Sequence, residues 1–429
     1  MYVCGPTVYD VPHIGHGRFA LVFDVIRRYL EWRGFEVRFV SNITDIEDKI
    51  IRKADETGLA YEEVVARYTE AWFDAMDRLG VRRPDEVPTA TAYVERMVTY
   101  IAELIERGRA YPTPDGVYFS VESLEDYGLL ARQSLESLQA GAGEREIVGE
   151  EHKRHAFDFA LWKKAKPGEP AWDSPWGQGR PGWHIECTVM ALDLLGEGFD
   201  LHGGGSDLAF PHHENERAQA VGAGRRFARY WLHNGMVTAA GGEKMAKSLG
   251  NYVSLTDLLT RVDPRAYRLL VLRSKYRSPL EVTPATLADA TDGMARLDNF
   301  ARRLGPVEAA PDPSVRERFR AAMDDDFTTP AATAAVFDAL RDANVALDAG
   351  DRATAAALGA AVLELTAALG LTLRGAGADP VDSGAAGLAS ARDAARRARD
   401  WARADALRDE LVSLGWKVED GPEGTRLSR

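Results

Sequence analysis

The alternation of apolar and polar positions at the start of the chain predicts a strand, a helix and a second strand. Residues 1–4 form an apolar run before Gly5-Pro6, which predicts a short buried strand that ends in a turn. Residues 15–33 repeat apolar positions at helical spacing, and residues 36–40 form a second apolar run. This order is typical of the first unit of a parallel α/β sheet with a right-handed crossover.

After residue 40, the pattern of apolar and polar residues changes several times along the chain. Further helices are predicted at 45–57, 61–79 and 91–107. Short strands and loops rich in Gly and Trp follow and indicate an insertion between two halves of one sheet, which resumes with segments at 182–195, 200–205 and 210–220. Amphipathic helices that predict a bundle lie at 285–305, 314–323, 330–347 and 351–370. A linker rich in Gly, Pro and Asp, a helical stretch and a small hairpin complete the chain at 374–387, 388–414 and 415–429.

Composition and charge exclude several classes of protein. With 45% hydrophobic and 28% charged residues, the chain has the composition of an ordinary globular protein of several domains. The net charge of −13 argues against a protein that coats nucleic acid indiscriminately, because such binding depends on neutralising phosphates. The sequence has neither an apolar run of membrane-spanning length nor a secretory pattern at its start, so we expect a cytoplasmic location with reduced thiols.

The two cysteines of the chain predict a metal site. Cys4 ends the first strand, and Cys187 closes the segment Gly182-Trp183-His184-Ile185-Glu186-Cys187. If residues 210–220 form a helix, His212 and Glu216 lie one turn apart on one face of it. Two thiolates, one imidazole and one carboxylate are a suitable ligand set for Zn²⁺.

Other interpretations of these residues stay open from spacing alone. His213 is three residues from Glu216 and fits a shared helical face as well as His212 does. Free cysteine is also often a small buried hydrophobic residue with no ligand. A disulfide is the least favoured alternative, because the chain lacks a signal peptide and a Cys-dense framework.

Two other segments carry residues that suit phosphate chemistry. His13-Ile14-Gly15-His16 stands where the first strand passes into the first helix, and open α/β sheets bind ligands at that place. Free backbone N–H groups, the helix dipole and two imidazoles would attract phosphate there. Lys244, Lys247 and Ser248 could meet the charge that grows on a phosphate as its bond to pyrophosphate breaks. Each segment alone is weak evidence, because turn glycines and solvated lysines are common.

Together these segments resemble the class I aminoacyl-tRNA synthetases, whose HIGH and KMSKS motifs match residues 13–16 and 244–248. Over its whole length the chain is similar to the bacterial cysteinyl-tRNA synthetases of that class. The other segments that carry this resemblance are Tyr2-Val3-Cys4-Gly5, Asn42-Ile43-Thr44-Asp45, Gly182-Trp183-His184-Ile185-Glu186-Cys187, His202-Gly203-Gly204-Gly205-Ser206-Asp207, Phe210-Pro211-His212-His213-Glu214-Asn215-Glu216, Met323-Asp324-Asp325-Asp326-Phe327 and Asp400-Trp401-Ala402-Arg403-Ala404-Asp405.

The resemblance implies an α/β fold, with a class I Rossmann-like parallel-sheet catalytic domain that carries an insertion. An α-helical bundle and a small C-terminal anticodon-binding domain would follow. The implied domains are a catalytic domain at 1–90 and 181–252, a connective insertion at 91–180, a stem-contact region at 253–292, a helical bundle at 293–373, a linker at 374–387 and an anticodon-binding domain at 388–429. Residues 392–408 hold six arginines against three aspartates, a pattern that a solvated helix face explains by itself but that becomes a candidate RNA contact here.

The resemblance also implies an activity and its residues. The enzyme would use ATP with Mg²⁺ to convert L-cysteine to cysteinyl-adenylate and would transfer the cysteinyl group to tRNA(Cys), as a monomer without a membrane partner. The implied zinc ligands, one ion per chain, are Cys4, Cys187, His212 and Glu216. The implied catalytic residues are His13, His16, Lys244 and Lys247, with Gly15 and Ser248 completing the ATP site. The implied cysteine pocket consists of Thr44, Trp183, His202 and Asp207.

Two departures from the family pattern lead to expectations of their own. Ala246 stands where the family usually has serine, so we expect loop conformation and rate to change before the chemistry is lost. Family members usually carry residues before the strand that ends at Cys4, so we expect that the start is truncated or misplaced and that restoring those residues raises zinc occupancy.

Two rival functions share parts of this pattern. A cysteine ligase of the mycothiol type has the same catalytic core but joins cysteine to an amino sugar and lacks an anticodon domain, so residues 388–429 favour tRNA. A non-catalytic paralogue that binds zinc and RNA is the second rival. The intact pairs His13 and His16, and Lys244 and Lys247, argue against it.

Overall fold

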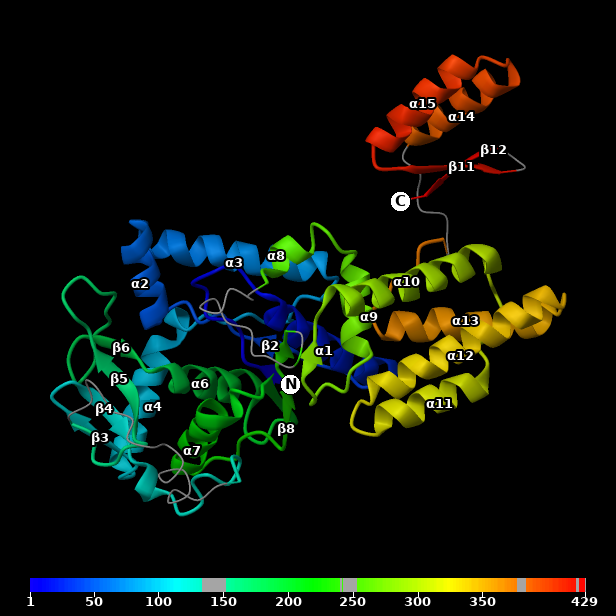
Figure 1. The fold of residues 1–429 in the computed structure, drawn as a ribbon. Helices are drawn as coiled ribbons and strands as arrows, with labels where there is room; N and C mark the ends of the chain where they lie inside the picture. The colour runs from blue at the N-terminus through cyan, green and yellow to red at the C-terminus, as the bar shows by residue number, and fades with distance from the viewer. Residues whose placement is uncertain (133–151, 240, 242–252, 376–382, 422–423, 429) are drawn as a thin grey trace. The chain divides into compact units, whose positions relative to one another are not determined.

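The structure is a computed structural model that describes residues 1–132, 152–239, 241, 253–375, 383–421 and 424–428 (Figure 1). The chain forms two compact units, Met1–Leu287 and Ala288–Arg429. The first unit contains a parallel sheet and a separate antiparallel sheet, and the described part of the second is helical apart from one hairpin.

A four-stranded parallel sheet forms the centre of the first unit, in the order β2-β1-β7-β8. Its strands are β1 (Tyr2–Val3), β2 (Val40–Ser41), β7 (Leu201–Gly205) and β8 (Tyr230–Asn234). Tyr2 pairs with Val40 on one side and with His202 on the other. β1 is buried on both faces, which explains why its sequence is continuously apolar. The parallel sheet confirms the predicted α/β fold class.

Helices surround this sheet and connect its strands. α1 (Ile14–Trp32) follows β1 and has its buried residues distributed along its whole length. The remaining elements around the sheet are α2 (Asp48–Thr57), α3 (Tyr61–Arg78), η1 (Thr91–Tyr93), α4 (Val94–Glu106), α6 (Trp183–Leu195), η3 (Ala209–His213), α7 (Glu214–Gly222), β9 (Val237–Thr238), α8 (Leu255–Leu258), α9 (Pro264–Leu272) and β10 (Leu280–Glu281). Among the described residues no helix combines the length and the apolar character needed to cross a bilayer.

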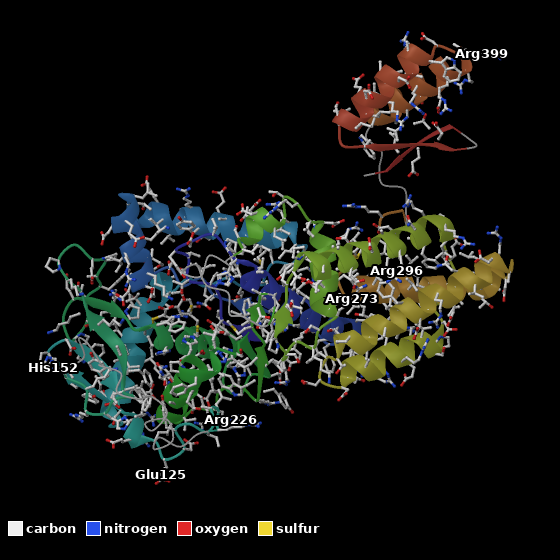
Figure 2. All side chains as sticks on the ribbon, in the orientation of Figure 1. Glu125, His152, Arg226, Arg273, Arg296 and Arg399 are labelled. Atoms are coloured by element: carbon white, nitrogen blue, oxygen red, sulfur yellow. The ribbon has the colours of Figure 1, made fainter. Side chains whose placement is uncertain are left out.

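The inserted segment forms a sheet of its own, in the antiparallel order β3-β4-β5-β6. Its elements are β3 (Ala110–Thr113), β4 (Gly116–Phe119), η2 (Val121–Ser123), β5 (Phe159–Lys164) and β6 (Gly179–Pro181). This sheet lies beside α4 and α6 (Figure 1), and Phe119, Trp162 and Ile185 are fully buried in their common core. Polar side chains such as Glu125, His152 and Arg226 lie on the outer surface of the unit (Figure 2).

The second unit contains the predicted helices. α11 (Pro313–Asp324), α12 (Thr329–Asp348) and α13 (Arg352–Ala368) pack against one another, and α10 (Pro284–Leu304) precedes them. The C-terminal part consists of α14 (Ser383–Arg397), α15 (Trp401–Ser413), β11 (Lys417–Gly421) and β12 (Gly424–Ser428). β11 and β12 pair antiparallel, as the predicted hairpin requires, and Ala385, Leu411 and Trp416 form a small core beside them.

Three elements differ from the predicted ones by more than a few residues or in their regularity. The strand predicted at 36–40 is reduced to Val40–Ser41, because the preceding residues do not pair with a neighbour among the described strands. The helix predicted at 388–414 is divided into α14 and α15 near Arg399, whose φ of 60° cannot continue a right-handed helix. The helix predicted at 210–220 becomes regular only at Glu214, since Phe210 has an extended backbone.

Candidate active site and metal centre

A cavity of about 270 Å³ opens at the carboxyl ends of β1 and β7, where open α/β sheets bind ligands. It is lined by residues from both halves of the sheet and from the first helix. These include Cys4, His13, Gly15, His16, Thr44, Trp183, Cys187, Asp207 and His212. Segments separated widely in the sequence therefore converge on one place, as the motif order predicts.

The base of this cavity is a buried cluster of sulfur, nitrogen and oxygen donors. Cys4 Sγ lies 3.7 Å from Cys187 Sγ and 3.5 Å from Glu216 Oε1. His212 Nε2 lies 3.1 Å from the same carboxylate oxygen. One donor atom of each residue falls within 4.8 Å of the others. Both cysteines are free thiols, since a disulfide would bring the sulfur atoms to roughly 2.05 Å.

A second set of donors overlaps the first and contains Cys4, His202, His213 and Glu216. The two sets differ in their access to the cavity. Three residues of the first set, Cys4, Cys187 and His212, line the cavity, whereas only Cys4 of the second set does. An ion held by the first set would therefore be within reach of a ligand in the cavity.

Burial decides the protonation of the cluster, and the spacing of its donors fits a bound cation. Burial raises the pKa of both thiols, and for Cys4 the neighbouring Cys187 and Glu216 raise the pKa further. Burial lowers the pKa of His212, so its imidazole stays neutral as a metal ligand must. Two ligands at the zinc–sulfur distance of about 2.3 Å in a tetrahedron are roughly 3.8 Å apart, close to the separation of the two sulfur atoms. The donor set therefore fits zinc.

His13 and His16 cap the first helix and also face the cavity. The backbone N–H of each residue donates to Nδ1 of the other, at 3.3 Å in both cases, and the rings stack with centroids 3.7 Å apart. Because Nδ1 accepts a hydrogen bond in each ring, the proton of the neutral imidazole is at Nε2. Burial lowers the pKa of His16 to about 3, and His13 contributes to this shift. Neutral rings thus offer N–H donors to an anion.

The four residues predicted for the cysteine pocket have different positions. Thr44, Trp183 and Asp207 line the cavity, and the Trp183 ring lies 4.1 Å from the His212 ring. Gly205 allows the Asp207 carboxylate to come close, since a Cβ at Gly205 would be 2.3 Å from Asp207 Oδ1. His202 is fully buried and is not among the residues that line the cavity; it contacts Glu216 instead.

Sequence reasoning missed two residues beside the pocket, Asn42 and Glu186. Both are buried and both contact the Thr44 hydroxyl. Burial raises the pKa of the Glu186 carboxyl well above its usual range. The available signal was a charged residue type next to the apolar position Ile185 in helix α6. The predicted ATP-site residues Lys244, Lys247 and Ser248, and Ala246 between them, lie outside the described residues.

Comparison with known proteins agrees with this arrangement. Residues 1–292 match the model of the class I tRNA synthetase (C) catalytic domain, residues 318–374 match the DALR domain, and residues 379–426 match the cysteinyl-tRNA ligase anticodon-binding domain. A cysteine–tRNA ligase of Halorhodospira halophila is 49% identical over 438 residues, which cover 100% of this chain and 94% of that protein. The chain belongs to the cysteine–tRNA ligase family.

A second relative and a solved structure agree with this family and its fold. The cysteine–tRNA ligase of Alkalilimnicola ehrlichii is 48% identical over 442 residues, and the match covers 100% of this chain and 95% of that protein. Among solved structures, methionyl-tRNA synthetase of Mycobacterium tuberculosis bound by methionyl-adenylate is similar, with a TM-score of 0.65 and 17% identity over 86% of this chain and 90% of that one. The cysteine–tRNA ligase family member described here therefore has a class I synthetase fold.

Proposed function

We propose that this chain activates L-cysteine with ATP to form cysteinyl-adenylate and then transfers the cysteinyl group to tRNA(Cys). Membership of the cysteine–tRNA ligase family supports this activity. The structural observation that supports it most strongly is the approach of Cys4 Sγ to within 3.7 Å of Cys187 Sγ at the base of a cavity that His13 and His16 also line.

One zinc ion would be held by Cys4, Cys187, His212 and Glu216. The access of three of these residues to the cavity supports this set over the one with His202 and His213. When bound, zinc would offer a position at which the substrate sulfur binds as thiolate. Serine differs from cysteine only in oxygen for sulfur, and shape alone rejects such a substitution weakly. A soft thiolate binds zinc far better than a neutral hydroxyl, so selection can occur at the binding step.

The ATP phosphates, with Mg²⁺, would lie against Gly15 and the Nε2–H groups of His13 and His16 at the start of α1. This position supports anion binding because both histidines and the positive end of the α1 dipole lie at the same cavity. Lys244, Lys247 and Ser248 would complete the site. Their role rests on the resemblance of their segment to the KMSKS motif.

Thr44, Trp183 and Asp207 would hold the amino acid. The Asp207 carboxylate suits the substrate ammonium group, and the Trp183 ring closes the wall beside His212. His202 would not contact the amino acid itself; it would orient Glu216, one of the proposed zinc ligands. This differs from the pocket contact implied by the resemblance alone.

In the first step a carboxylate oxygen of cysteine attacks the α-phosphorus of ATP, and the bond from that phosphorus to the pyrophosphate oxygen breaks. The products are cysteinyl-adenylate and pyrophosphate. No proton needs to be removed from the attacking carboxylate, so positioning and charge stabilisation are the main requirements. In the second step a terminal hydroxyl of the tRNA replaces the adenylate.

The remaining parts of the chain would bind the tRNA. We assign 1–90 and 181–252 to the catalytic domain, 91–180 to the connective insertion, 253–292 to the stem-contact region, 293–373 to the bundle, 374–387 to the linker and 388–429 to the anticodon-binding domain. The match of residues 379–426 to an anticodon-binding domain supports the last assignment. A monomer in the cytoplasm, where thiols remain reduced, is part of the same proposal.

The test is aminoacylation of tRNA(Cys) by the purified chain, with an amino sugar offered as the competing acceptor. We expect cysteine-dependent ATP–pyrophosphate exchange and transfer to tRNA alone. The amino-sugar ligase is not favoured, because the matched anticodon-binding domain has no role in it. Transfer to the amino sugar but not to tRNA would contradict the proposal, and so would the absence of exchange.

A further inference from the structure

Lys49 is the only lysine or arginine among the described residues that line the cavity of the candidate active site. Among the same residues Asp207 is the only acidic one, and it suits the substrate ammonium group. Lys49 is the second residue of α2 and its side chain is exposed, so its ammonium group lies where the cavity opens to solvent. The proposed function as described above gives this cation no role.

The acidic residues that precede Lys49 in the chain are engaged elsewhere. Asp48 pairs with Lys163 at 2.9 Å and also pairs with Arg180. Glu47 Oε2 accepts a hydrogen bond of 2.5 Å from the backbone N–H of Lys49 and so caps α2. The Lys49 ammonium group itself pairs with no carboxylate among the residues that the structure describes. Its charge is therefore available to an anion in the cavity.

The aromatic ring of Tyr9 holds this ammonium group beside the cavity. Lys49 Nζ lies 5.4 Å from the centroid of the Tyr9 ring, which is within the range of about 6 Å for a cation–π contact. Tyr9 lines the same cavity. Because a lysine side chain is otherwise flexible, this contact limits where the ammonium group lies.

Three kinds of anion would enter this cavity: the ATP phosphates, the cysteine carboxylate and the phosphates of the tRNA acceptor end. The ATP phosphates have the start of α1, with His13 and His16. Only two carbon atoms separate the sulfur of cysteine from its carboxyl carbon, so a cysteine held at the base of the cavity keeps its carboxylate deep inside. The acceptor end enters from solvent and must pass the exposed Lys49.

We propose that Lys49 binds a phosphate of the tRNA acceptor end where it enters the cavity, with the Tyr9 ring directing the ammonium group. This inference rests on the proposed function, because it takes tRNA as the second substrate. Proteins hold single-stranded nucleic acids with cations that follow the backbone, and a compact ammonium group with three donors suits a phosphate. Lys49 acts in the transfer step and not in the formation of the adenylate.

The test uses Lys49→Gln, which removes the charge and keeps most of the side chain, and Lys49→Arg, which keeps the charge. The first readout is single-turnover transfer from preformed cysteinyl-adenylate at a tRNA(Cys) concentration below saturation. We expect Lys49→Gln to slow this transfer about tenfold or more, the range of a hydrogen bond between charged groups. Lys49→Arg should transfer at nearly the rate of the wild type.

The salt dependence of tRNA binding is the second readout, and a purely structural role of Lys49 would not change it. The Kd of tRNA(Cys) is measured from about 50 to 200 mM KCl. In a plot of log Kd against log salt concentration, the slope for Lys49→Gln should be smaller than that of the wild type by about 0.7, the value for one phosphate of a single strand. Cysteine-dependent pyrophosphate exchange should stay within about twofold of the wild type.

Variants of Tyr9 test the contact that directs the ammonium group. Tyr9→Phe keeps the ring face and should retain the transfer rate. Tyr9→Leu removes the ring and should slow transfer by about two- to fivefold, which corresponds to an exposed cation–π contact.

Lys53→Gln is the matched control. Lys53 lies one turn further along α2, and its Nζ lies 5.8 Å from the centroid of the Tyr68 ring, but neither residue lines the cavity. The variant removes the same charge from the same helix. It should leave the transfer rate within about twofold of the wild type and the salt slope unchanged.

Each result has a definite meaning. An unchanged transfer rate or salt slope in Lys49→Gln would overturn the inference. A loss of pyrophosphate exchange as large as the loss of transfer would also overturn it, because Lys49 would then bind ATP or the cysteine carboxylate. If the wild type shows no exchange, the proposed function fails, and the salt slopes of the wild type and Lys49→Gln still decide whether Lys49 binds a tRNA phosphate.

Discussion

His202 Nε2 lies 2.9 Å from Glu216 Oε2, and Nδ1 of the same ring lies 3.1 Å from the carbonyl oxygen of Tyr2. Both side chains are fully buried. The ring therefore connects the carboxylate of Glu216 in α7 to the backbone of β1 at Tyr2, two residues before Cys4. Partners of this kind orient the ligands of metal sites and influence how tightly the metal is held.

Replacing His202 tests this contact. We expect His202→Ala to weaken zinc binding by about 10- to 100-fold, because Glu216 loses the partner that orients its carboxylate. The affinity would be measured by competition with a chelator of known strength. His152→Ala removes an exposed histidine of the insertion and should leave the affinity unchanged. Equal zinc affinity in His202→Ala and the wild type would show that His202 does not support the metal site.

The lowered pKa of His16 predicts how stability depends on pH. The pKa is about 3 in the folded chain, below the ordinary value of 6.5 that applies when the chain is unfolded. As the pH falls below 6.5 the unfolded chain binds a proton that the folded chain does not, so stability falls with pH. His16→Asn lacks this titration.

We therefore expect the free energy of unfolding to decrease between pH 7 and pH 5 in both proteins, and the decrease to be about 1 kcal/mol larger in the wild type than in His16→Asn. This value is smaller than the full effect of the pKa shift, because the ring is partly exposed and solvent weakens the effect. Urea unfolding at the two pH values provides the measurement. An identical decrease in both proteins would mean that His16 is not held neutral.

Replacing Lys244 or Lys247 should lower the rate of cysteine activation without lowering the zinc content. Each lysine would stabilise charge on the phosphates, so Lys244→Ala and Lys247→Ala should lower cysteine-dependent pyrophosphate exchange by about 100-fold or more. Ala246→Ser, which restores the usual family residue, should raise the rate. Zinc content should equal that of the wild type in all three. Loss of zinc, or a normal exchange rate in either alanine variant, would contradict the assigned role.

The surroundings of Gly5 leave no room for a side chain at this position beside the pocket. A Cβ at this position would lie 1.5 Å from the carbonyl oxygen of Asn42, and a backbone atom cannot move aside easily. Gly5→Ala should therefore lower the free energy of unfolding by about 3 kcal/mol or more. Gly387→Ala is the control, because a Cβ there meets no atom within 4 Å in α14. Similar melting temperatures for both variants would refute the steric argument.

The sequence predicted those features that depend on local pattern or on residue type. The structure confirms the buried strand before Gly5 and the helix after His13. Both could be predicted because the spacing of their apolar residues is typical of a buried strand and of a helix that packs on a parallel sheet. Cys4 and Cys187 could be paired because thiolates with a nearby imidazole and carboxylate suggest one ion.

The features that could not be predicted depend on tertiary contacts. In the sheet of the insertion, the pairings of β4 with β5 and of β5 with β6 join strands separated by long loops, for which short apolar runs give no register. The contact of Glu186 with Thr44 joins residues 142 positions apart, and a spacing of that size has no periodicity. His202 could be placed near the site from its motif, but only the structure shows that its ring contacts Glu216 and does not line the cavity.

X-ray absorption at the zinc edge reports directly which atoms of the chain and of the substrate coordinate the proposed ion. We expect one zinc ion per chain with two sulfur neighbours, from Cys4 and Cys187. A third sulfur neighbour should be present when L-cysteine is added and absent when L-serine is added. Cys187→Ser should lose sulfur coordination and most of its zinc. A sulfur count that does not change with cysteine, or a wild-type chain that binds no zinc, would contradict the account.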